Sequence, residues 1–121
     1  MKKNLHTFKF LIVAICAAVL SLALSCGHQQ QAAQKQTEAD SIIQAAISAK
    51  DDERVITLCD SFQQTGDISK IRASTERGIA KDRLNRWKEA EDEYKKALAE
   101  TPKNEADSLL FYQSACYLAN I

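Results

Sequence analysis

Nucleophilic and metal-binding side chains are scarce in the part of this 121-residue chain that can fold. Its two histidines, His6 and His28, both precede residue 30, ahead of the first pattern typical of a packed element. Its four cysteines are accompanied by no base at catalytic spacing, no glycine-rich phosphate loop and no metal-ligand motif. We therefore expect no catalytic residue, no metal site and no cofactor, and we interpret the protein as not being an enzyme.

A run of carboxylates near residue 90 is the group that could be taken for a metal or acid–base site. Its members are Glu89, Glu91, Asp92 and Glu93. Side chains this close together on a helix cannot all point the same way, and no histidine lies near them. Lys95 and Lys96 follow at the spacing where opposite charges pair along a helix, at about 0.5 kcal/mol or less per pair. The run is therefore predicted to be a solvated helix face.

The composition favours helices and argues against a nucleic-acid partner. One proline and three glycines leave few turn residues for an all-β fold. The chain has 16 basic and 16 acidic side chains, but its first 25 residues hold three of the bases and no acid. The remainder is therefore mildly acidic, whereas nucleic-acid binding requires a basic surface. The expected fold class is all-α.

Residues 1–25 have the form of a secretory signal peptide. Lys2 and Lys3 precede an apolar run over residues 10–25, as a basic start precedes the apolar core of such signals. The run is shorter than the roughly 20 residues that a membrane-spanning helix needs. An uncleaved anchor is the alternative interpretation.

Residues 23–26 (Ala-Leu-Ser-Cys) resemble the lipobox of bacterial lipoproteins, in the looser form found in the Bacteroidetes, with Ala23 where leucine is most common. The resemblance implies cleavage just before Cys26 and makes this cysteine the lipidation residue, since its thiol is the soft nucleophile that thioether formation requires. It also implies acylation of the new amino terminus, with chains such as palmitate, and several chains anchor stably. We expect a protein of the bacterial cell envelope, lipid-anchored to a membrane and facing the periplasm.

Residues 26–37 are predicted to form a glutamine-rich tether. Five glutamines fall within residues 27–37, and no large apolar side chain accompanies them. Such a segment buries too little surface to offset the entropy of ordering. It would let the part of the chain after residue 37 stand away from the membrane.

Residues 38–121 carry a repeated helical pattern. The run Glu-Ala-Asp-Ser-Ile-Ile at residues 38–43 recurs as Glu-Ala-Asp-Ser-Leu-Leu at residues 105–110. The offset is about twice a period of roughly 34 residues, the spacing of repeats made of two helices.

Residues 71–104 resemble a tetratricopeptide repeat (TPR). The residues that define the repeat are Gly78, Trp87, Ala90, Tyr94, Ala97 and Pro102. Three positions depart from the pattern, because large apolar or aromatic residues are usual where this chain has Ser74, Arg77 and Lys81. The resemblance implies a helix-turn-helix repeat solenoid of about two and a half repeats.

The residues of this unit predict specific packing. Gly78 and Ala90 are small, so two antiparallel helices are expected to touch there. Trp87 and Tyr94 are expected in the core, and Asn85 is expected in the turn with a positive φ. Pro102 is expected to end the second helix.

Two further helices are predicted upstream, at about residues 38–50 and 52–65. Their expected amino-terminal caps are Thr37 with Asp40 for the first and Asp51 for the second. Gly66 should close the second helix, and Asp67 or Ser69 should start the next. Cys59 and Cys116 fall in different units, too far apart for a disulfide, and are expected to be two buried thiols.

The resemblance also implies where a partner binds, because the first helix of each TPR unit lines the concave groove. The groove residues would be Arg72, Thr75, Ile79, Asp82 and Arg83. An ordinary solvated face is nearly as good an explanation for them. The lysine and asparagine set with which some TPR proteins hold a terminal carboxylate is absent, since Thr75 and Ile79 occupy those places.

Residues 109–121 contain no charged side chain, whereas the last helix of a solenoid usually has a polar outer face. We therefore expect either a chain truncated at its carboxyl terminus within a longer repeat protein or self-association through this helix. The predicted function is a lipid-anchored envelope scaffold that binds an unknown protein or peptide. The alternative is the amino-terminal periplasmic sensing segment of a TPR-containing sensor histidine kinase or transcriptional regulator.

Overall fold

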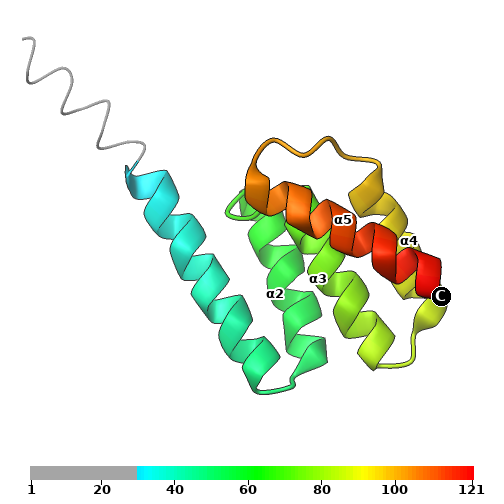
Figure 1. Ribbon diagram of the computed structural model, residues 1–121. Helices are drawn as coiled ribbons and strands as arrows, with labels where there is room; N and C mark the ends of the chain where they lie inside the picture. The colour runs from blue at the N-terminus through cyan, green and yellow to red at the C-terminus, as the bar shows by residue number, and fades with distance from the viewer. Residues whose placement is uncertain (1–29) are drawn as a thin grey trace, which may run out of the picture. The chain divides into compact units, whose positions relative to one another are not determined.

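The computed structural model describes residues 30–121, and every regular element within them is an α-helix. One helix covers residues 30–48, and four more follow it in chain order (Figure 1): α2 (Asp52–Thr65), α3 (Lys70–Arg83), α4 (Trp87–Leu98) and α5 (Glu105–Asn120). The expected all-α fold class is confirmed for this part of the chain. The predicted signal peptide and Cys26 lie outside the described residues.

The first described helix differs from the prediction at both ends. It is already helical at residue 30, so the expected start near residue 38 is wrong, and Thr37 lies inside the helix instead of capping it. Glutamine and alanine have good helix propensity, and no glycine or proline interrupts the sequence here. Residues 30–38 are all exposed. The part of the predicted tether that the structure describes is therefore a solvated helix.

The predicted caps after residue 50 are confirmed. The Asp51 side chain accepts a hydrogen bond from the Arg54 backbone N–H at 3.2 Å, which starts α2. Gly66 ends α2 in the left-handed conformation with φ 76°. Of the two candidates for the next cap, Ser69 is the one used, since its Oγ accepts from the Arg72 N–H at 3.0 Å.

A tight turn joins α3 to α4. Asn85 has φ 60° there, as predicted for a residue that tolerates the left-handed region. The Arg86 N–H donates to the Lys81 carbonyl at 2.8 Å and so closes the end of α3. Successive helices consequently run in opposite directions (Figure 1). Pro102 lies in the segment between α4 and α5, beyond the observed end of α4 at Leu98.

Helix α3 is the central element of residues 35–121, which form one compact unit. It contacts α2, α4 and α5, and α4 also contacts α5. Small and β-branched side chains from the 30–48 helix, α2 and α3 fill one core, as expected from their helical spacing. This core consists of Ala39, Ile43, Ala46, Val55, Cys59, Ile68, Ala73 and Ala80. None of the helices within residues 30–121 is long and apolar enough to cross a membrane.

The α3–α4 contact is closest at Gly78, but the residue that faces it is Tyr94. A Cβ atom at Gly78 would lie 2.5 Å from Tyr94 Cε1, so only glycine fits beneath the ring. Ala90 and Ala97 are fully buried on the same helix as Tyr94, as predicted, and the atoms nearest to a Cβ at Gly78 belong to the tyrosine ring. The prediction that Trp87 packs in the core is wrong, because it is 60% exposed at the first position of α4.

Candidate functional site

The five predicted groove residues of α3 do not form one open surface. Thr75 is fully buried, and its hydroxyl hydrogen-bonds to the Ile71 carbonyl at 2.7 Å and to Ser114 Oγ of α5 at 2.9 Å. The expectation that Thr75 lines an accessible groove is therefore wrong, because α5 packs over this side of α3. Ile79 is half-buried.

Two of the remaining groove residues are engaged in ion pairs. Arg72 lies 3.0 Å from Asp40 Oδ1 and 3.4 Å from Glu76 Oε1. Burial raises the pKa of Glu76, with the charge of Asp40 acting in the same direction against the opposing charge of Arg72. Arg83 Nη1 lies 3.5 Å from Asp52 Oδ1. The pairs with Asp40 and Asp52 connect α3 to the helices before it, and all three pairs leave the two arginines less available to a partner.

A buried charged network lies between α2, α3 and α4, where the TPR pattern would place large apolar residues. Arg77 donates from Nε to Glu93 at 3.1 Å and from Nη1 to Asp60 at 2.9 Å and to Gln63 at 2.7 Å. Lys81 Nζ donates to the other oxygen of Glu93 at 2.9 Å. Because these partners lie on α2 and α4, Arg77 connects both helices to α3.

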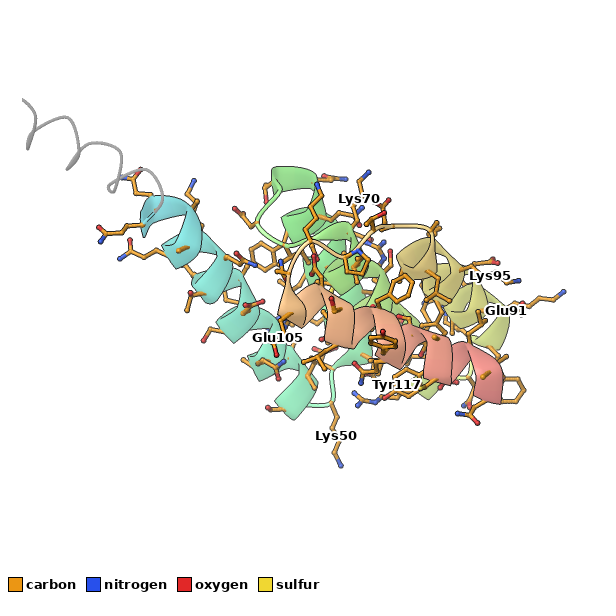
Figure 2. All side chains as sticks on the ribbon, turned by 45° about the horizontal axis from the view of Figure 1, so that its top comes forward. Lys50, Lys70, Glu91, Lys95, Glu105 and Tyr117 are labelled. Atoms are coloured by element: carbon orange, nitrogen blue, oxygen red, sulfur yellow. The ribbon has the colours of Figure 1, made fainter. Side chains whose placement is uncertain are left out.

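Glu93 therefore does not belong to the predicted solvated face, since only 3% of the residue is exposed. Burial alone would raise its pKa, but the hydrogen bond from Lys81 and the charge of Arg77 hold the pKa of Glu93 below its ordinary value. The other acids of the run fit the prediction better. Glu91 pairs with Lys95 on the outer side of α4 (Figure 2), and Glu89 pairs with Arg86.

The network opens onto a polar cavity of about 480 Å³. Its lining residues are Ile56, Asp60, Gln63, Gln64, Arg77, Lys81, Glu93 and Lys96. The buried charged network was not predicted from the sequence, although the spacing of two basic residues indicated it. Arg77 and Lys81 are four residues apart on the side of α3 that the TPR pattern buries, so they required a buried acid opposite them.

A second pocket, of about 270 Å³, lies where the end of α3, the start of α4 and the end of α5 meet. We call it the aromatic pocket, and it is lined by Asp82, Trp87, Tyr117, Asn120 and Ile121. The Tyr117 ring stacks on Tyr94 with centroids 5.5 Å apart and planes 20° apart. Of the predicted groove residues, Asp82 is the one that contributes to this pocket.

The Tyr94 ring at the base of the stack is fully buried. Tyr94 Oη is buried without a hydrogen-bond partner among the described residues. Burial raises the pKa of Tyr94, and the charge of Asp82 raises it further.

Helix α5 buries one side against α3 and α4 and leaves the other side exposed. On the buried side, Ser114 is fully covered and Asp107 accepts a hydrogen bond from Ser69 Oγ at 2.7 Å. On the other side, Leu109 is 67% and Tyr112 is 69% exposed. Glu105 begins this helix and Tyr117 lies near its end (Figure 2).

The two cysteines of the described region are both free, as expected, but only one is buried. Burial raises the pKa of the Cys59 thiol to about 12, so it stays protonated at neutral pH. Cys116 is exposed, which contradicts the prediction of a buried thiol. It stands two residues after Ser114, and residues two apart on a helix do not share a face.

Within residues 30–121, no three histidine, cysteine, aspartate or glutamate side chains are grouped so that they could hold a metal ion. Searches of protein-family models, of curated proteins and of solved structures return no match for this chain.

Proposed function

We propose that this protein is a TPR-like helical-repeat scaffold, lipid-anchored in the bacterial envelope, that binds another protein through the surface of α4 and α5. The observation that carries this proposal is the placement of its exposed apolar side chains. The large hydrophobic residues that are mostly exposed are Trp87, Leu109, Tyr112 and Ile121. All four lie on or at the end of α4 and α5, and large apolar side chains left exposed on neighbouring helices are typical of protein–protein contacts.

The types of these residues agree with a binding surface. Tryptophan and tyrosine are enriched at the energetically dominant positions of interfaces, because each offers a large rigid apolar area and one polar atom. The repeat interpretation is supported by the packing of α3, which contacts both the next helix, α4, and the one after it, α5. In helical-repeat proteins each hairpin packs in this way on its neighbour and offers an extended binding surface.

Site-specific photo-crosslinking in cells tests the proposed binding surface. A benzophenone amino acid at Tyr112 should yield one dominant protein adduct, identified by mass spectrometry. The matched control places the same group at Ser61, which is exposed on α2, outside the proposed binding surface. Equal adducts from both positions, or none from Tyr112, would contradict the proposal.

The proposed anchor rests on Cys26 and is tested separately. Replacing Cys26 with serine removes the thiol that would be lipidated, so we expect an unprocessed precursor, identified by its intact mass. Wild-type protein that keeps Met1 in the membrane fraction would contradict the anchor without affecting the binding surface.

A further inference from the structure

We propose that the aromatic pocket binds a cationic side chain, lysine or arginine, of the protein partner. The inference rests on the proposed protein-binding function and specifies its chemistry. The pocket combines a carboxylate, Asp82, with two aromatic rings, Trp87 and Tyr117. An ammonium or guanidinium group is attracted both by a carboxylate and by the face of an aromatic ring, and tryptophan is the best ring for this purpose.

The charge of Asp82 is left without a partner inside the described part of the chain. No hydrogen bond or ion pair reaches its carboxylate within residues 30–121, although three basic residues lie close in sequence. Lys81 is directed to Glu93, at 2.9 Å, and Arg83 to Asp52, at 3.5 Å. Arg86 pairs with Glu89 and Glu53. Each of these three cations is thus paired with another acid, and none lies within ion-pair distance of the Asp82 carboxylate.

The remaining lining groups suit a cation rather than an anion. Trp87 is 60% exposed, so its ring is open to a ligand. Tyr117 is held in place by its stacking on Tyr94. The Asn120 Nδ2 donates to the Cys116 carbonyl at 2.9 Å, which leaves the Oδ1 of the amide as an acceptor. The pocket lining contains no lysine or arginine.

The size of the pocket argues for one side chain. Its volume of about 270 Å³ is below the usual range for small-molecule sites, which begins at about 300 Å³. Trp87 and Ile121 belong both to this pocket and to the exposed apolar set on α4 and α5. A partner that covers that surface would therefore also reach the pocket, where one of its basic side chains could enter.

The test uses the full chain in neutral detergent micelles and three short blocked peptides, Gly-Lys-Gly, Gly-Arg-Gly and Gly-Gln-Gly. Trp87 is the chain's one tryptophan, so its indole N–H signal in an NMR titration reports on the pocket without ambiguity. We expect saturable shifts with the lysine and arginine peptides and none with the glutamine peptide. The shifts should weaken as salt is added, because an exposed charge is screened.

The decisive comparison is between Asp82→Asn and Asp92→Asn, which remove the same charge from inside the pocket and from a residue outside its lining. Asp82→Asn should weaken binding of the lysine peptide by about three- to tenfold, while Asp92→Asn, exposed on α4, should leave its Kd unchanged. Equal weakening by both variants, or equal binding of the glutamine peptide, would overturn the inference. Circular dichroism of both variants checks that the helices are intact.

Failure of this inference is distinguishable from failure of the proposed function. If the Tyr112 crosslink persists undiminished in Asp82→Asn, the surface binds a protein but the pocket does not hold its basic side chain, and the inference is wrong. If the crosslink weakens in Asp82→Asn and not in Asp92→Asn, both proposals are supported. Loss of every crosslink in the wild type removes the function on which the inference rests and overturns both.

Discussion

Gly78 and Tyr94 show how one residue without a side chain determines the packing of two helices. Tyr94 is fully buried, and its ring occupies the space that a Cβ at Gly78 would need. The sequence predicted that Gly78 lies where two helices touch and that Tyr94 is buried in the core. It could not predict that the two face each other, because the side of α4 that meets α3 depends on the geometry of the turn at Asn85.

Gly78→Ala should destabilise the protein, because the added carbon would lie 2.5 Å from the Tyr94 ring. The expected cost is about 1–3 kcal/mol, the usual range for overpacking, measured by urea unfolding. In a Tyr94→Leu background the same change should cost much less, since the obstructing ring is gone and alanine is a better helix former than glycine. An equal cost in both backgrounds would contradict the contact.

At the scale of helices, the ends marked by capping residues were predictable, whereas the early start of the first helix and the buried charged contacts were not. The caps at Asp51, Gly66 and Ser69 follow from side chains that satisfy helix-end groups, and the structure confirms them. The buried network around Arg77 was not predicted. The spacing of apolar residues predicts which face of a helix is apolar, but it does not predict that two opposite charges are buried together. Arg77, Glu93 and Asp60 come from three different helices.

Removing the Arg77 charge should therefore weaken the association of α2, α3 and α4. For Arg77→Met we expect a loss of about 2–3 kcal/mol, less than the roughly 3–5 kcal/mol of a wholly uncompensated buried charge, because Lys81 still pairs with Glu93. Urea unfolding measures this loss. Lys95→Met, which breaks an exposed pair with Glu91, should change stability by no more than about 0.5 kcal/mol.

The same network gives the protein a pH dependence of known sign. The folded pKa of Glu93 lies below its ordinary value of 4.5, so ionised Glu93 stabilises the fold above that pH. This stabilisation is lost as the pH falls through the lower folded pKa. The difference in stability between wild type and Arg77→Met should accordingly shrink on acidification below pH 4.5. A difference that stays constant over that range would show that the Arg77–Glu93 charge pair does not stabilise the fold.

At the scale of the whole described unit, burial is uneven along the chain. The 30–48 helix, α2 and α3 share a continuous core, whereas α5 is covered on one side only. The sequence predicted this asymmetry from the absence of charge over residues 109–121. The side that stays exposed could not be predicted, because α5 is apolar around much of its circumference and its orientation depends on polar contacts such as Thr75–Ser114.

The exposed side of α5 should make the isolated unit associate with itself when no partner covers it. Leu109, Tyr112 and Cys116 follow one another at three- and four-residue spacing, the pattern with which helices pair. We call these three residues the α5 stripe. An uncharged apolar surface packs best against another uncharged surface, and the α5 stripe of a second copy of the chain offers one. Burying such side chains is worth about 1.5–3 kcal/mol for each large one. We therefore expect a dimer or larger species from residues 30–121 in analytical ultracentrifugation at tens of micromolar.

The α5 stripe is the cause of this association only if charges placed on it abolish it. Leu109→Glu with Tyr112→Lys should yield a monomer, whereas Ser61→Lys, at an exposed position of α2, should leave the assembly unchanged. A bis-maleimide should join two copies through the exposed Cys116, because Cys59 is buried and protonated. A soluble wild-type monomer at these concentrations would show that apolar exposure on α5 is too small to hold two copies together.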